Sequence, residues 1–183
     1  MLHNPVEFIL KDGRKCILRI PEEKDAAEML EYRIKTAGET DYLLNYPEDL
    51  ADYTIDDQLK FIKRCALSQS VLMLTAFVDG KLAGNCQISF NTKIKIRHRA
   101  GIGIALLKEY WGLGIGSVMF SELIKAAENY GEVSQLELEV IEGNEKAIAL
   151  YKKFGFETVS ENPDAIRLKD GTMLKELFMV KKI

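Results

Sequence analysis

The sequence predicts an α/β chain of the mixed α+β kind: a mixed, largely antiparallel twisted sheet with helices on both faces. Some strand-forming runs follow each other across tight turns, whereas others are separated by stretches with apolar residues at helical spacing. Tight turns join antiparallel strands and helical crossovers join parallel ones, so the two together build a mixed sheet. The chain has 183 residues, of which 47% are hydrophobic, and we expect a single domain over residues 1–183.

The first part of the chain predicts one strand and two helices. The strand covers residues 15–20. A helix should follow over residues 21–37, because a proline opens this stretch and Gly38 closes it. A second helix should cover residues 55–67, where Thr54 can cap the first turn with its hydroxyl.

A hairpin should come next. Residues 71–78 and 81–90 are two strand-forming runs, and Asp79 and Gly80 supply the turn between them. The basic stretch 91–99 is either a connection or part of a strand.

A strand, a glycine-rich turn and a helix then follow in succession. Residues 102–107 are an apolar run typical of a buried strand, and residues 117–129 carry apolar side chains at helical spacing. Between them stand Gly112, Gly114 and Gly116 at alternate positions. Backbone N–H groups at a helix start attract anions, and glycines let a ligand approach closely. The turn therefore predicts a site for a phosphate or pyrophosphate.

The glycine spacing excludes two common phosphate sites. A P-loop requires a lysine after Gly116, where Ser117 stands. A dinucleotide fingerprint requires glycine or alanine where Ser117 and Met119 stand. A helix start without any ligand also fits the glycines alone.

The last part of the chain predicts three more strands and one helix. Residues 136–140 alternate between apolar and acidic side chains, as a half-buried strand does. A short helix lies within residues 143–156 and is closed by Gly155. Two further strands are expected around residues 166–168 and 173–180.

Charge, cysteine content and hydropathy narrow the function classes. A net charge of −3 argues against a nucleic-acid binder. The three cysteines, Cys16, Cys65 and Cys86, have the spacing of neither a disulfide framework nor a metal site, so we expect no metal. We see no leader sequence and no membrane-spanning apolar run, and we expect a cytoplasmic protein without membrane association.

Two motifs together resemble the GCN5-related N-acetyltransferase (GNAT) superfamily. Its coenzyme A loop has the form R/Q-x-x-G-x-G/A, and residues 111–116 match it except that Trp111 stands at the Arg or Gln position. The second signature is V-x-x-x-N-x-x-A-x-x-L-Y-x-x-x-G-F. Its matching residues are Val140, Asn144, Ala147, Leu150, Tyr151, Gly155 and Phe156. The resemblance is close over roughly a third of the chain.

The resemblance implies a GNAT-like sheet whose fourth and fifth strands splay into a cleft that binds acetyl-coenzyme A. It places the pantetheine amides on the backbone of Leu106 and Leu107, and it places Asn144 beside the same arm. It places the pyrophosphate on the turn formed by Trp111, Gly112, Leu113, Gly114, Ile115, Gly116 and Ser117.

The implied reaction is acetyl transfer from a thioester to a primary amine, with Tyr151 as the acid for the leaving sulfur. Asn144 and Tyr151 are seven residues apart and would share one helix face. One alternative is a non-catalytic acyl-coenzyme A binding module, which would not need an acid at position 151. A nucleotide-binding domain of another class is a further alternative, which the glycine spacing disfavours.

The sequence does not identify the general base. The family often places a glutamate on the central strand, but residues 100–104 contain no acid. The remaining candidates are a water relay and the side chains of His98, Glu109, Glu137 and Glu139.

An acidic, tyrosine-containing stretch suggests the acceptor. Residues 38–57 carry seven acids and no lysine or arginine. In the family this stretch borders the acceptor pocket, which makes Glu39, Asp41 and Tyr42 candidate substrate contacts. The hypothesis is a small-molecule or peptide amine, cationic as in a polyamine or a basic peptide. A solvated loop with acids in a helix's first turn explains the same residues. A homodimer is left open.

Overall fold

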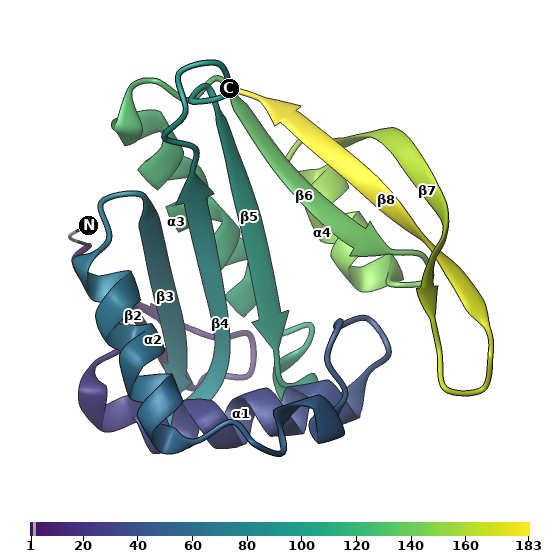
Figure 1. Ribbon diagram of the computed structural model, residues 1–183. Coiled ribbons are helices and arrows are strands. Elements are labelled where there is room, and N and C mark those ends of the chain that lie inside the picture. The colour runs from purple at the N-terminus through teal and green to yellow at the C-terminus, as the bar shows by residue number, and fades with distance from the viewer. Residues whose placement is uncertain (2) are drawn as a thin grey trace.

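The computed structural model describes Met1 and residues 3–183, which form one eight-stranded sheet (Figure 1). The strand order across the sheet is β1-β2-β3-β4-β5-β6-β8-β7. Every neighbouring pair is antiparallel except β5 and β6, which are parallel. The strands are β1 (Val6–Ile9), β2 (Lys15–Arg19), β3 (Val71–Val78), β4 (Lys81–Phe90), β5 (Arg99–Leu106), β6 (Gln135–Ile141), β7 (Glu157–Arg167) and β8 (Met173–Lys182). The predicted mixed, largely antiparallel sheet is confirmed.

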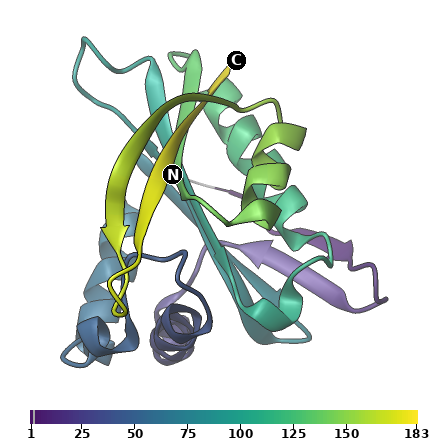
Figure 2. The same cartoon turned by 90° about the vertical axis from the view of Figure 1, so that its right-hand side faces the viewer.

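Helices cover both faces of this sheet, as predicted. Figure 2 shows α1 and α2 on one side, and α3 and α4 on the other. The helices are α1 (Ala26–Glu39), α2 (Ile55–Leu67), α3 (Ile115–Tyr130) and α4 (Glu145–Lys153), and the short 3₁₀ turns are η1 (Glu23–Asp25), η2 (Pro47–Leu50) and η3 (Lys108–Tyr110).

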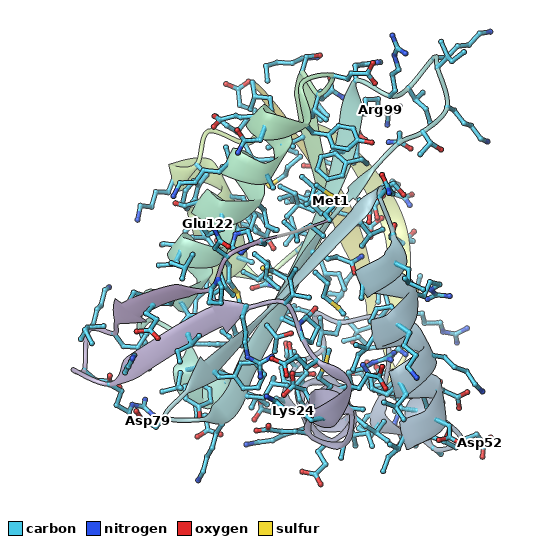
Figure 3. The ribbon with its side chains drawn as sticks, turned by 90° about the vertical axis from the view of Figure 1, so that its left-hand side faces the viewer. Met1, Lys24, Asp52, Asp79, Arg99 and Glu122 are labelled. Carbon is cyan, nitrogen blue, oxygen red and sulfur yellow. The ribbon has the colours of Figure 1, made fainter. Side chains whose placement is uncertain are left out.

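β5 and β6 diverge in the middle of the sheet, where the cleft was predicted, and we call the space between them the cleft. They pair only where Arg99–Gly101 meet Gln135–Glu137, and beyond these residues they diverge (Figure 1). The paired end lies near Arg99, at the end of the molecule opposite Asp79 (Figure 3). The splay is the predicted one, although the two strands are the fifth and sixth in the chain because β1 was not predicted.

The core lies on both sides of the sheet and reaches the helix that carries Tyr151. Phe120 of α3 is fully buried, and its ring centroid lies 5.1 Å from that of Tyr151 in α4 and 5.8 Å from that of Phe156. Burying three aromatic rings together contributes several kcal/mol to stability, on the order of 2 kcal/mol for each ring. This packing fixes α4 against α3, beside the glycine-rich turn.

The boundaries of the first helix differ from the prediction. The stretch begins with η1, and α1 itself starts at Ala26. The helix also continues through Gly38 to Glu39, so the prediction that Gly38 ends it was wrong. A Cβ at Gly38 would lie 3.4 Å from Pro47 Cγ. Gly38 therefore allows close packing of the next segment instead of capping the helix. The predicted cap at Thr54 is confirmed, since its hydroxyl accepts the Asp57 N–H.

Two strands near the chain ends were predicted poorly. The short strand β1 was not predicted, and β7 covers eleven residues where only its last part was expected. β7 is almost wholly exposed at the sheet edge, contains Pro163, and changes register twice against β8. An edge strand needs no buried face, so β7 lacks the apolar alternation that signals a strand.

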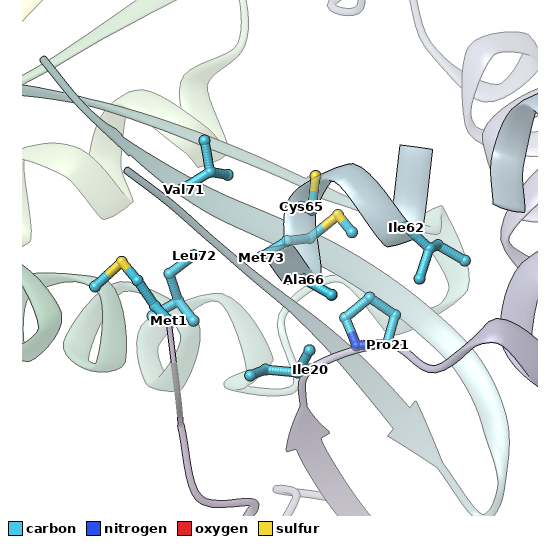
Figure 4. A pocket seen from close by; sticks show the side chains of 9 residues that line it. All are labelled: Met1, Ile20, Pro21, Ile62, Cys65, Ala66, Val71, Leu72 and Met73. Carbon is cyan, nitrogen blue, oxygen red and sulfur yellow. The ribbon is translucent and has the colours of Figure 1, made fainter. Parts of the chain in front are cut away.

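The region drawn in Figure 4 is an apolar seam where β3 meets α2, lined by residues such as Ile62 and Met73, with a volume of about 10 Å³. That space admits about one water molecule. A larger hollow of about 250 Å³ lies beside α3, lined in part by His3 and Glu122. Neither is lined by the glycine-rich turn. Within the described part of the chain, no helix has the length and apolar character needed to cross a bilayer.

Candidate active site

The three glycines between β5 and α3 serve two purposes. Gly112 and Gly114 have φ angles of 80° and 101°, a conformation that side chains rarely adopt, and a Cβ at either would meet nothing within 4 Å. A Cβ at Gly116 would lie 3.1 Å from Leu150 Cδ2 and 3.6 Å from Leu106 Cδ1. The first two glycines therefore shape a turn with open space above it, and the third lets α3 pack closely on α4 and β5.

The turn presents a row of unused hydrogen-bond donors. The backbone N–H groups of residues 112–116 have no acceptor among the described residues. They stand at the N-terminus of α3, a helix of 16 residues, where the helix dipole adds partial positive charge. The residues that make up the cradle are Trp111, Gly112, Leu113, Gly114, Ile115, Gly116 and Ser117. This arrangement fits a pyrophosphate.

The unpaired edge of β5 leads from the cleft to this cradle. The Leu107 N–H donates to the Ala83 carbonyl at 3.0 Å, so it faces β4 and is not free for a ligand. Backbone groups alternate along a strand, so those of Leu106 face the cleft. Of the two residues predicted to contact the cofactor arm, Leu106 alone is placed at the open edge.

Trp111 also uses that edge. Its indole N–H donates to the Leu106 carbonyl at 2.9 Å, and the Lys146 ammonium lies 4.9 Å from the centre of its ring. The Trp111 side chain, at the atypical position of the glycine motif, thus satisfies the last carbonyl of β5. The backbone cradle that follows does not depend on it.

Asn144 is the N-cap of α4, shortly after β6, and Tyr151 lies seven residues further along the same helix. The Asn144 side-chain oxygen accepts the Ala147 N–H at 3.3 Å, which caps the helix, and the side-chain NH₂ has no partner among the residues that the structure describes. The ring of Tyr151 is buried, and burial raises the pKa of its hydroxyl to about 12. The Tyr151 hydroxyl has no hydrogen-bond partner among the described residues. Among the described residues, His3 Nδ1 is the only fully buried side-chain polar atom that lacks a partner. The Tyr151 hydroxyl, which also lacks one, is therefore not fully buried and retains contact with solvent.

The candidate bases differ in how much they are already engaged. Glu109 lies in η3 and forms an exposed ion pair with Lys35 at 2.7 Å. Glu137 is buried, not solvent-facing as its alternating pattern suggested, because Arg99 binds both of its carboxylate oxygens at the closed end of the cleft. His98 is exposed in the connection before β5.

Glu139 lies at the rim of the cleft, beside a carboxylate that the sequence did not single out. It is exposed on β6, two residues beyond the last residue that pairs with β5. On β8, burial raises the pKa of Glu176, and the nearby Glu139 carboxylate raises it further. Only the β6–β8 register brings these two acids together, and that register is not readable from the sequence.

The predicted substrate contacts lie together at the open end of the cleft. Glu39 accepts the Lys108 N–H at 2.7 Å, and the Tyr42 hydroxyl donates to the Gly143 carbonyl at 2.8 Å. Asp41 is exposed beside them. Lys169, which the sequence did not single out, contacts the same segment from the β7–β8 turn.

Known proteins resemble this chain in sequence and in fold. A sequence profile of the acetyltransferase (GNAT) family matches residues 32–156. An N-alpha-acetyltransferase of Sulfurisphaera tokodaii is 30% identical over 155 residues, which cover 75% of this chain and 87% of the relative. The L-amino acid N-acetyltransferase AaaT of Escherichia coli is 28% identical over 119 residues, 65% of this chain and 73% of that protein. The crystal structure of a GNAT-family acetyltransferase from Streptococcus pneumoniae superposes with a TM-score of 0.85 at 30% identity, covering 92% of this chain and 99% of that one.

Proposed function

This chain belongs to the acetyltransferase (GNAT) family, and from that premise we propose that it moves the acetyl group of acetyl-coenzyme A to a primary amine by direct attack on the thioester. The observation that carries the proposal is the continuous path from the open β5 edge to the row of free N–H groups at residues 112–116. A pantetheine arm fits the edge and a pyrophosphate fits the cradle.

Acetyl-coenzyme A supplies an acyl group already activated as a thioester. The amine nitrogen bonds to the acetyl carbon, the carbon–sulfur bond breaks, and one amine proton passes to a base. The role we assign to Tyr151 is at the leaving sulfur. Its pKa of about 12 keeps the hydroxyl protonated across the neutral range. A thiol has a pKa of about 8.5, well below that of the hydroxyl, so the proton stays on Tyr151. The hydroxyl therefore stabilises the departing thiolate by donating a hydrogen bond to it.

The acceptor amine must be uncharged when it attacks the thioester, although an alkylammonium has a pKa of about 10.4 and so arrives protonated near neutral pH. The rim carboxylates Glu139 and Glu176 are the acceptors we propose for its proton, directly or through water. Glu109 and Glu137 already hold cations, which leaves them less suited to this task.

We further propose a cationic acceptor, attracted by fewer acids of residues 38–57 than the sequence suggested. Several acids of the 38–57 stretch have structural partners: Glu39 accepts the Lys108 N–H, Glu48 pairs with Lys169, and Asp57 accepts the Thr54 N–H at the start of α2. Of the acids without such a partner, Asp41 stands at the open end, and we propose that it attracts the acceptor together with the Glu139–Glu176 pair of β6 and β8. A cation between two repelling carboxylates would relieve their repulsion. An L-amino acid, as in the name of the Escherichia coli relative, and an alpha-amino group, as in the name of the Sulfurisphaera tokodaii relative, both supply such an amine.

Titration calorimetry with acetyl-coenzyme A, coenzyme A and NAD tests the cofactor. Binding of the first two without NAD supports the proposal, whereas binding of NAD alone refutes it. A thiol-release assay over a panel of polyamines, lysyl peptides, neutral amino acids and acidic amines then tests the reaction. Binding without thiol release on any amine would favour the acyl-coenzyme A binding module. A preference for acidic acceptors, or rates on cationic ones that ignore salt, would exclude the electrostatic part of the proposal.

A further inference from the structure

One acceptor on the open edge of β5 is already in use. The Leu106 carbonyl accepts the indole N–H of Trp111 at 2.9 Å. Leu106 lies beyond Gly101, where the pairing of β5 with β6 ends, and the N–H of its neighbour Leu107 bonds to β4. Since backbone groups alternate along a strand, the Leu106 carbonyl faces the cleft. It is therefore the acceptor that an amide N–H of a pantetheine arm would meet there.

The Trp111 side chain is half-buried and is held by weak contacts. Its indole forms a neutral hydrogen bond, and the centre of its ring lies 4.9 Å from the Lys146 ammonium. Contacts of both kinds contribute little where solvent has access. The main chain is fixed separately, because the Trp111 backbone N–H donates to the Lys108 carbonyl at 3.2 Å. The side chain can therefore leave the strand edge while the turn that carries it keeps its shape.

We propose that Trp111 is a placeholder for the pantetheine arm and thereby sets the affinity for coenzyme A. In the free protein the indole holds the Leu106 carbonyl, and it gives up this acceptor to an amide N–H of the arm when coenzyme A binds. One donor replaces another, so the carbonyl is not left without a partner. The indole must move, because a ring whose N–H lies 2.9 Å from the carbonyl covers the edge along which the arm has to lie. This inference rests on the coenzyme A site of the proposed function and adds a residue that sets its affinity.

The chemistry of tryptophan suits this replacement of one donor by another. Indole has one N–H donor and no acceptor, so it can satisfy a carbonyl without repelling a phosphate nearby. The arginine of the family motif would instead be drawn to the phosphates themselves. An open strand edge is also a template for pairing with another chain, and the indole covers the end of this one in the free protein. Ligands are therefore distinguished by the arm: coenzyme A and pantetheine displace the indole, whereas ADP binds at the cradle without displacing it.

Hydrogen exchange of the indole N–H tests the displacement without relying on catalysis. Trp111 is the single tryptophan of the chain, so an isotope-labelled protein gives one indole N–H signal in its NMR spectrum. Saturating coenzyme A or pantetheine should speed the exchange of this proton with water by about fivefold, the worth of one neutral hydrogen bond. ADP, which carries a diphosphate without the arm, should leave the rate unchanged. An indole N–H that stays equally protected with coenzyme A bound overturns the proposal.

Removal of the indole donor should change stability and affinity in opposite directions. Trp111→Phe should unfold at lower urea concentration, yet it should bind coenzyme A about twofold to fivefold more tightly, because no bonded indole has to be displaced. Its affinity for ADP should not change. The benzothiophene analogue of tryptophan at this position, which keeps both rings and lacks the N–H, should behave in the same way. A purely structural role for Trp111 would lower stability and affinity together, and weaker or unchanged binding of coenzyme A in both variants contradicts the inference.

A matched control and a separate readout complete the test. Tyr130→Phe also removes one polar group from a half-buried aromatic side chain, and the Tyr130 hydroxyl has no partner among the described residues, so its affinity for coenzyme A should equal that of the wild type. If coenzyme A speeds exchange of the indole N–H but no amine is acetylated, the placeholder is supported and the acetyl transfer is refuted. If amines are acetylated while the indole N–H stays protected, the placeholder alone is refuted.

Discussion

Substitution of Gly114 by valine tests the anion cradle directly. Gly114 is the N-cap of α3 with φ 101°, and a Cβ there would project into space that no described atom occupies within 4 Å. The side chain would therefore stand where the pyrophosphate should lie. Loss of one or two charged hydrogen bonds costs about 2–4 kcal/mol, or roughly 30-fold to 1,000-fold in Kd. The forced backbone conformation should lower stability by about 1–3 kcal/mol as well.

The other end of the same helix supplies the control. Gly131 is the C-cap of α3 with φ 78°, and a Cβ there also meets nothing within 4 Å. Gly131→Val should therefore show a similar loss of stability and leave affinity for coenzyme A unchanged. Calorimetry with coenzyme A and with pantetheine, which lacks the pyrophosphate, separates the two effects. A folded Gly114→Val protein that binds coenzyme A normally, or an equal loss in Gly131→Val, would refute the cradle.

Further outcomes follow from single side chains. Tyr151→Phe should lower kcat by about 10-fold to 10³-fold with unchanged coenzyme A affinity. Because the Tyr151 pKa is about 12, this hydroxyl does not titrate below pH 10, so any fall in kcat/KM in that range comes from another group and should persist in the variant. Asp25→Asn should cost about 3 kcal/mol, measured by urea unfolding, because it leaves Arg19 without its buried bidentate partner. Burial raises the pKa of Asp25, but hydrogen bonds from Arg19 and a backbone N–H lower it by more, so the net shift is downward. The carboxylate therefore stabilises the folded protein above its unfolded pKa, and the difference in unfolding free energy between wild type and Asp25→Asn should shrink as the pH falls below about 4. Trp111→Phe should cost about 1 kcal/mol, because the Leu106 carbonyl loses its donor, and the fluorescence of this single tryptophan should change when acetyl-coenzyme A binds to the wild type.

The parts of the fold that were predicted correctly have local causes. The β3–β4 hairpin follows from Asp79 and Gly80, both of which adopt positive φ, and α2 begins where Thr54 caps it. These signals lie within a few residues of the structure they specify. β7 had no such signal, because its stability comes from pairing with β8 at the edge of the sheet rather than from burial of its own side chains. Tertiary pairing of that kind leaves little pattern in a single chain.

The same distinction applies to the candidate site. The glycine-rich turn at the start of α3 was predictable because its glycines specify it locally. The surroundings of the carboxylates were not. Glu137 and Glu139 both alternate with apolar residues, yet Arg99 from the neighbouring strand pairs with Glu137, which is buried, and Glu139 stays exposed at the rim. Lys169 meets Glu48 across 121 positions of the chain, a contact that depends on the whole fold.

The three glycines of the turn show why a motif match does not assign a role to each of its residues. They recur at alternate positions and look equivalent in the sequence, but Gly114 has positive φ and open space above it, whereas Gly116 faces Leu150 at contact distance. A side chain at Gly116 would therefore disturb the packing of α3 on α4, and with it the position of Tyr151. Weaker activity in a Gly116 variant would report on that packing. Since Trp111 contributes its indole to the strand and not to the row of N–H groups, its departure from the family pattern leaves the cradle intact.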